Sequence, residues 1–212
     1  MLRADARRNR DQIISAAAGM FATAGLDVPM EAIARAAGVG VGTLYRRFPD
    51  RSELVAAVAG QGFRTLLEEL RVARETETSA WAVLVRIITE SESLRLTVHL
   101  AFLSPLSWTA VHGATLSRGA HEELMAVLDH LVRDAQAEGS IRSDIGSGDA
   151  LSLLSLILGA RPPDSDPVGQ LRTQRSLWLV LDGLRATPGS PLPGEPVSVG
   201  DLSIGAARTG AP

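Results

Sequence analysis

Four side chains able to bind phosphate or base edges lie close together in the first quarter of the chain. They are Thr43, Tyr45, Arg46 and Arg47. Threonine, tyrosine and arginine donate hydrogen bonds to phosphate oxygens, and arginine also reads guanine. Leu44 and Phe48 are spaced to point together in the opposite direction, toward a core. The chemistry that this group favours is nucleic-acid recognition.

The surrounding residues predict two short helices joined by a turn. Met30, Ile33 and Ala34 repeat at helical spacing up to Ala37-Gly38, where glycine can adopt the left-handed cap. A second helix is expected from about Val41, followed by a break at Pro49-Asp50 and a new helix from Arg51, capped by Asp50 and Glu53. Two such helices form a helix-turn-helix, whose second helix enters the major groove. The alternative is an ordinary exposed helical hairpin.

Other kinds of site find less support in the sequence. The glycines between Gly38 and Gly42 do not follow a strand, as a nucleotide-binding loop requires. The four histidines, His99, His112, His121 and His130, are spaced nine or thirteen residues apart, which is not a repeat of the helical turn, so no metal site is predicted. No serine lies in a G-x-S-x-G elbow, and no paired catalytic groups are evident. We therefore expect neither an enzyme nor a cofactor.

Charge is distributed unevenly along the 212 residues. Up to Arg64 there are nine arginines and six acids, a net charge of +3, whereas the remainder carries twelve arginines and eighteen acids, a net charge of −6. A basic segment joined to an acidic body is typical of a small nucleic-acid-binding unit on a non-binding domain. The chain has no cysteine, no apolar run of membrane-spanning length and no signal-peptide core, so a cytoplasmic protein without membrane contact is expected.

The run IARAAGVGVGTLYRRF resembles the DNA-binding segment of the TetR-type bacterial transcriptional regulators, IA-x-x-x-G-V-S-x-G-T-L-Y-x-x-F. Gly40 replaces a common serine and Arg47 a common histidine or tyrosine. The resemblance covers about residues 8–60, and the later helices are similar to the subgroup with an SbtR-like C-terminal domain. It implies DNA contacts by Pro29 and Met30, by Val41, Gly42, Thr43, Tyr45, Arg46 and Arg47, and by Arg51 on phosphate.

The rest of the chain predicts an all-α protein. We expect a helix-turn-helix domain over residues 1–50, a helical ligand-binding and dimerisation domain over 51–187, and a disordered tail over 188–212, where proline, glycine and serine dominate.

Two later segments are apolar on more than one face, which predicts burial by a second subunit. They are the helix near Asp149–Gly159 and the last helix, from Leu171 to Ala186. Together with the resemblance they predict a two-fold, four-helix interface. Its expected residues are Leu154, Ile157, Leu158, Leu177, Trp178, Leu181 and Leu184. The alternative is burial within one subunit.

A ligand pocket is expected in the segment Trp81–Trp108 and on the long helix after it. Its expected residues are Trp81, His99, Phe102, Trp108, Leu124 and Leu128, a mostly apolar set with few polar groups. Ser91 and Thr97 are further candidates to orient a ligand. Core packing would explain the same residues without a ligand.

Taken together, these features predict a homodimeric, ligand-responsive repressor that binds a pseudo-palindromic operator and responds to a small apolar or aromatic effector. The alternative is a ligand-independent regulator or architectural DNA-binding protein with the same helix-turn-helix unit.

Overall fold

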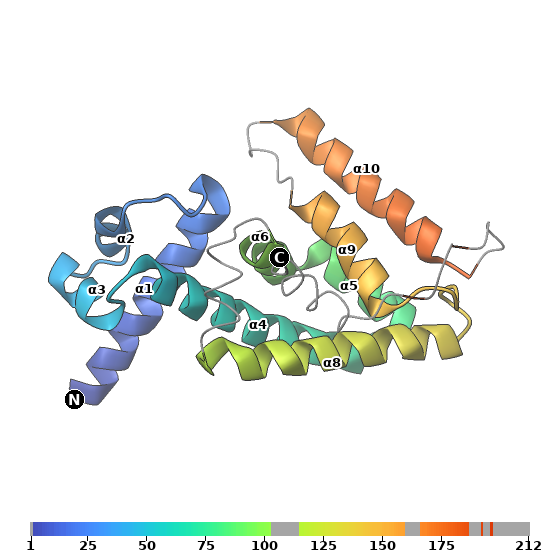
Figure 1. Cartoon of the computed structure of the whole chain (residues 1–212), viewed down its shortest axis with the longest axis horizontal. Helices are drawn as coiled ribbons and strands as arrows, with labels where there is room; N and C mark the ends of the chain where they lie inside the picture. Colours follow the sequence, from blue (N-terminus) through green and yellow to red (C-terminus); the bar gives the residue numbers. More distant parts are fainter. Residues whose placement is uncertain (1, 103–114, 160–165, 187–191, 193–195, 197–212) are drawn as a thin grey trace, which may run out of the picture. The chain divides into compact units, whose positions relative to one another are not determined.

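The computed structural model describes residues 2–102, 115–159, 166–186, 192 and 196. Within these residues the fold is all-α, as predicted, with a single antiparallel bridge between Ile141 and Arg185. The helices are α1 (Leu2–Ala24), α2 (Met30–Ala36), α3 (Val41–Arg47), α4 (Arg51–Thr76), α5 (Ala80–Glu90), α6 (Glu92–Phe102), α8 (Thr115–Ala137), α9 (Ser147–Leu158) and α10 (Pro167–Leu184) (Figure 1).

The chain divides into two compact units. The first contains residues 1–65 and 95–121, and the second contains residues 66–94 and 122–212. The domain boundary predicted at residue 50 falls just before α4, whose first part, up to Thr65, groups with the N-terminal helices. The predicted tail lies outside the described residues, apart from Leu192 and Pro196.

The core of the first unit forms where α1, α2 and α3 pack together. Its central side chains are fully or almost fully buried: Ile13, Phe21, Ile33, Leu44 and Phe48. α1 contacts α2, and α2 contacts α3. The helices α2 and α3 have seven residues each, too few to be stable alone in water, so burial of these side chains must hold them in place.

The turn between α2 and α3 depends on Gly38. This residue has a φ of +67°, in the left-handed region that L side chains rarely adopt. Its N–H donates to Arg35 O at 3.1 Å, and the next N–H, of Val39, donates to Ala34 O at 3.0 Å. These two bonds satisfy carbonyls at the end of α2 and reverse the chain into α3. The predicted helix-turn-helix geometry is therefore present.

The start of α4 is capped as the sequence predicts. Asp50 Oδ1 accepts a hydrogen bond from the Glu53 N–H at 2.8 Å. A carboxylate at this position satisfies one otherwise unpaired donor and interacts favourably with the helix dipole.

The second unit contains α5, α9 and α10 with the adjoining parts of α4 and α8. α9 and α10 lie side by side, and α10 also contacts α5 (Figure 1). The end of α10 is tied to the connection between α8 and α9, where the Arg142 N–H donates to Leu184 O at 3.0 Å and the Ala186 N–H donates to Ser140 O at 3.2 Å.

The starts of α9 and α10 differ from the sequence prediction. α9 begins at Ser147, two residues before the expected start near Asp149, and the Asp149 carboxylate accepts from the Gly146 N–H at 2.8 Å. α10 begins at Pro167, four residues earlier than expected, because Asp166 caps it by accepting from the Gly169 N–H at 2.9 Å. Proline is well suited to a first helical position, where its missing N–H is not needed.

Substitution of Gly38 tests the importance of the turn. Gly38→Ala should lower the free energy of unfolding by about 1–2 kcal/mol, the cost of a left-handed L-residue, because no atom within 4 Å would clash with the new methyl group. Gly42→Ala is the matched control. It lies inside α3 with equally open space, and should instead stabilise the helix by up to about 1 kcal/mol. Urea unfolding followed by circular dichroism measures both, and equal effects would contradict this account of the turn.

Candidate DNA-binding surface

The surface formed by α2 and α3 carries most of the predicted DNA contacts. Six of the nine residues are exposed: Pro29, Val41, Gly42, Tyr45, Arg46 and Arg47. Thr43 is half-buried, and its Oγ1 lies 3.5 Å from Arg46 Nη2. Because Leu44 and Phe48 are buried, α3 turns its polar side chains outward, as the sequence predicts. The two arginines occupy the last turn of α3.

Two of the nine residues have other roles in the structure. Met30 is only 6% exposed and its side chain belongs to the core, so burial argues against the predicted DNA contact by this side chain. Arg51 is half-buried, and its Nη1 donates to the backbone carbonyls of Leu26 and Val28, the latter at 2.6 Å. A guanidinium that satisfies two carbonyls of the α1–α2 connection stabilises the fold directly. Its predicted phosphate contact would have to use its remaining N–H groups.

Arg10 also contributes to the core of this unit. Its guanidinium carbon lies 5.8 Å from the centre of the Phe48 ring. A cation over an aromatic face is favourable by about 0.5–1 kcal/mol at exposed sites. Arg10 of α1 therefore takes part in packing within this unit.

One residue of this surface was missed by the sequence analysis. Glu31, in the first turn of α2, is exposed, and its Oε1 accepts a hydrogen bond from the Tyr45 hydroxyl at 3.2 Å. This hydrogen bond is the main cause of the raised pKa of the Tyr45 phenol, with burial and the Glu31 charge adding to it. Its place next to Met30, at the predicted contact end of α2, was the only sequence signal for it.

The predicted ligand residues are divided between the two units. His99 belongs to the first unit, and Trp81, Leu124 and Leu128 belong to the second. Leu124 is buried, and the others are half-buried. The Trp108 side chain and that of Phe102 lie outside the described residues. The ring of Trp81 is covered by Arg185, whose guanidinium carbon lies 4.9 Å from the ring centre, so Trp81 packs against the residue that follows α10.

Ser91 and Thr97, the two further candidates to orient a ligand, differ in their hydrogen bonding. Ser91 Oγ donates to Glu69 Oε2 at 2.5 Å and accepts from the Leu94 N–H at 2.9 Å, so it caps α6. The Thr97 hydroxyl is buried without a hydrogen-bond partner. It lies next to Gly62: a Cβ atom added at Gly62 would be 3.0 Å from Thr97 Oγ1. Thr97 thus retains an unused donor, whereas Ser91 does not.

An open groove of about 580 Å³ in the second unit is polar rather than apolar. It is lined by Arg74, Glu77, Thr78, Ser79, Ala80, Val83, His130, Leu131, Asp134, Ala137 and Glu138. Its charges are used within the protein: Arg74 pairs with Asp134 at 2.6 Å, and the Glu138 carboxylate accepts from the Ala80 N–H at 2.9 Å. None of the predicted ligand residues whose side chains the structure describes, Trp81, His99, Leu124 and Leu128, lines it.

Histidines and acids do not assemble a metal site in the part of the chain that the structure describes. His121 packs against Phe63, with ring centres 5.2 Å apart, and His130 lies 3.6 Å from Asp134. Nor is any of the described helices sufficiently long and apolar to cross a membrane.

The residues predicted for a dimer interface are mostly covered by their own subunit. Five of the seven are at most 7% exposed: Leu154, Leu158, Leu177, Leu181 and Leu184. Ile157 is half-buried, and Trp178 is 47% exposed. The large apolar side chains that α9 and α10 expose are instead Leu153, Leu156, Val168, Leu171, Trp178 and Leu179. These five leucines are therefore removed from the predicted dimer interface, because they are already buried within the protomer.

Arg51 and Arg46 should respond differently to truncation. Arg51→Ala should lower the free energy of unfolding by about 1.5–3 kcal/mol, the usual contribution of hydrogen bonds to a charged group, because it leaves the Leu26 and Val28 carbonyls unpaired. Arg46→Ala, at an exposed position, should change stability by less than about 0.5 kcal/mol. Thermal and urea unfolding provide the measurement. Equal stability of the two variants would show that the Arg51 contacts are unimportant.

Comparison with known proteins agrees with this geometry. Residues 13–58 match the family described as "Bacterial regulatory proteins, tetR family", and residues 106–186 match the "Transcriptional regulator SbtR-like, C-terminal domain". Over 84 residues the chain is 32% identical to an HTH-type transcriptional regulator of Staphylococcus aureus, a match that covers 39% of this chain and spans 45% of that relative.

Two solved structures are similar over almost their whole length. A TetR transcriptional regulator from Streptomyces coelicolor is 32% identical with a TM-score of 0.58, and the match covers 84% of this chain and 99% of that one. A TetR regulatory protein from Mycobacterium vanbaalenii is 31% identical with a TM-score of 0.52, and the match covers 87% and 99%. The exposed face of α3, the turn at Gly38 and these matches lead to one conclusion: the chain belongs to the TetR family of helix-turn-helix transcriptional regulators, which are not enzymes, and carries an SbtR-like C-terminal domain.

Proposed function

We propose that the protein is a homodimeric repressor that binds a pseudo-palindromic operator in the cytoplasm and releases it in response to a small apolar or aromatic effector. The observation that carries the DNA-binding part is the outward face of α3, where Tyr45, Arg46 and Arg47 are exposed together. A dimer places two such helices on successive major-groove segments, so the operator should have two half-sites.

The dimer part of the proposal rests on the apolar side chains that α9 and α10 expose. Val168, Leu171, Trp178 and Leu179 lie within about 100° of one another around α10, so they share one side of the helix. Leu156 of α9 is 76% exposed and Leu179 of α10 is 71% exposed, although the two helices contact each other. Large apolar surfaces of this kind mark protein interaction sites. A second copy of the same two helices is the partner that best fits a two-fold regulator.

The effector part of the proposal follows the sequence prediction. The proposed residues remain Trp81, His99, Phe102, Trp108, Leu124 and Leu128. The Thr97 hydroxyl, buried and without a partner, is an additional group that a polar atom of an effector could satisfy. An effector can release DNA only to the extent that it binds the released state more tightly than the DNA-bound state.

DNA binding is tested by selecting operators from fragmented genomic DNA and measuring the affinity of each variant. Arg46→Ala or Arg47→Ala should weaken operator binding by about 1–3 kcal/mol, because each removes a contact to phosphate or guanine. Arg64→Ala is the control: it removes an exposed arginine of α4 in the same unit. The residue assignment fails if both α3 variants bind like the unaltered protein, and the proposed function fails if no palindrome is enriched.

Assembly is tested by placing a charge on the exposed apolar surface. Leu156→Glu and Leu179→Glu should convert dimers to folded monomers with weaker operator binding, because a carboxylate would be buried without a partner at the interface. Ala126→Glu, at an exposed position of α8, should leave the dimer intact. Size-exclusion chromatography with light scattering at micromolar concentration measures the change. A monomeric unaltered protein would end the dimer proposal.

The effector proposal is tested by a thermal-shift screen of apolar and aromatic compounds. A true effector stabilises the protein by about 2.7 kcal/mol at one hundred times its dissociation constant, and should also weaken operator binding. Phe102→Ala and Trp108→Ala should reduce both effects together. If no stabilising compound weakens DNA binding, the ligand-independent regulator becomes the better description.

A further inference from the structure

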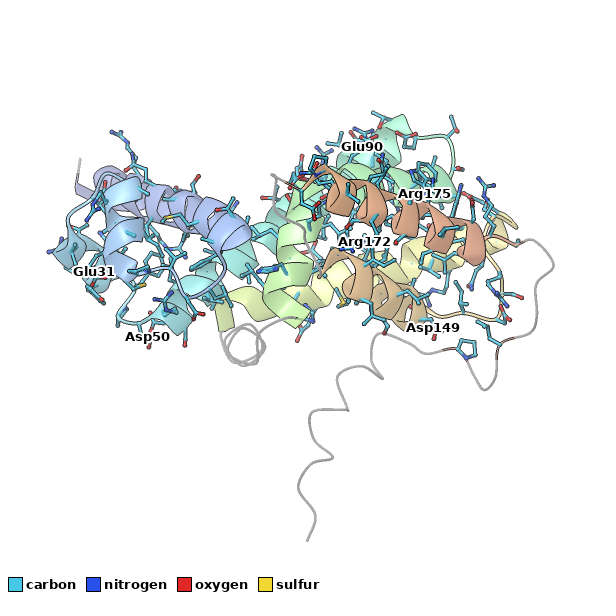
Figure 2. The ribbon with its side chains drawn as sticks, turned by 90° about the horizontal axis from the view of Figure 1, so that it is seen from above. Glu31, Asp50, Glu90, Asp149, Arg172 and Arg175 are labelled. Atoms are coloured by element: carbon cyan, nitrogen blue, oxygen red, sulfur yellow. The ribbon has the colours of Figure 1, made fainter. Side chains whose placement is uncertain are left out.

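The hydrogen bond between Tyr45 and Glu31 joins the recognition helix to the helix before it. The Tyr45 hydroxyl lies on α3 and the Glu31 carboxylate in the first turn of α2, with 3.2 Å between the two oxygens. Both side chains are exposed, and Glu31 lies at the surface of the unit (Figure 2). A carboxylate thus occupies the surface that the exposed arginines of α3 would present to DNA.

A tyrosine hydroxyl has one hydrogen to donate, and this limits what Tyr45 can do. Phosphate oxygens and an ionised carboxylate are both acceptors, so the hydroxyl can serve Glu31 or a phosphate, not both. A tyrosine hydroxyl, with an ordinary pKa of about 10, keeps its proton at neutral pH and remains a donor, and the hydrogen bond to Glu31 raises the pKa of Tyr45 further. A phosphate contact by Tyr45 therefore requires the hydroxyl to leave Glu31.

When the hydroxyl leaves, the Glu31 carboxylate is left beside DNA. Like charges repel, and an acid close to phosphate weakens binding to every sequence unless another donor reaches it. In the major groove, the amino groups of cytosine and adenine are such donors, and glutamate accepts from cytosine N4. A sequence that presents an amino group at this place satisfies Glu31, whereas other sequences do not.

We propose that Glu31 is a specificity-determining residue. On non-operator DNA it holds the Tyr45 hydroxyl away from the phosphates. On the operator, a base amino group takes the place of the hydroxyl as the donor to Glu31, and the hydroxyl is released. The exchange conserves hydrogen bonds on the operator: the hydroxyl passes to a phosphate, and a base amino group donates to Glu31. On other DNA, either the bond from the hydroxyl to phosphate or the bond from a base amino group to Glu31 is missing. The inference rests on the proposed DNA-binding function and adds a residue to it.

The test compares affinity for a selected operator duplex with affinity for a scrambled duplex of the same composition. Glu31→Gln should tighten binding to the scrambled duplex, and should lower the ratio of the two affinities by about 5- to 10-fold, the effect of one hydrogen bond of ordinary net strength. Glu53→Gln is the matched control, since it removes the same charge from an exposed position of the same unit. In a Tyr45→Phe background, the effect of Glu31→Gln on scrambled DNA should shrink to that of the control.

A repeated operator selection with the Glu31→Gln protein provides the second measurement. Preference for cytosine or adenine at one position of each half-site should be lost, while the rest of the operator is retained. The inference is overturned if Glu31→Gln changes the affinity ratio no more than Glu53→Gln does, or if it selects an operator with unchanged base preferences. If the unaltered protein selects no operator at all, the proposed function itself fails, so the two failures are distinguishable.

Discussion

The left-handed turn at Gly38 is the constraint on which the DNA-binding surface depends. It ends α2 and starts α3 within a few residues, so that Ile33 and Leu44 both lie in one core. Both side chains are fully buried there. Neither seven-residue helix would persist without that burial. Because Leu44 and Phe48 fix the rotation of α3, they also determine which side chains face outward. The outward side chains of α3 are thus positioned by apolar residues that are themselves buried.

Arginine has two physical roles in this unit. Arg51 gives its N–H groups to two backbone carbonyls, and Arg10 lies over the Phe48 ring, so both stabilise the fold. Arg46 and Arg47, on the exposed side of α3, are available to a polyanion. Guanidinium suits both roles, since it is always charged and offers several donors in a plane. A charge count alone therefore overstates the number of arginines that can bind phosphate.

The DNA-binding unit was largely predictable from sequence because several local signals agree. Helical periodicity, the glycine at position 38 and the cap at Asp50 each act over a few residues, and the structure confirms all three. What sequence could not reveal were contacts between residues distant along the chain. The Arg51 bonds span 25 and 23 residues, and the Tyr45–Glu31 bond spans 14. Met30 is a different case: its helical spacing with Ile33 and Ala34 already indicates the buried face, and only the family resemblance predicted a DNA contact for it.

The helices α9 and α10 show why a correct pattern can yield the wrong residues. Their sequences are apolar on two sides, and the structure buries one side within the subunit while exposing the other. Leu181 and Leu179 are equally hydrophobic and only two residues apart, yet one is fully buried and the other is 71% exposed. Hydrophobicity reports how much surface must be covered, whereas the packing of α10 on α5 and α9 decides which stripe is covered internally. The exposed stripe is the surface that we propose for a second subunit, and it is offset from the buried one by about half a helical turn.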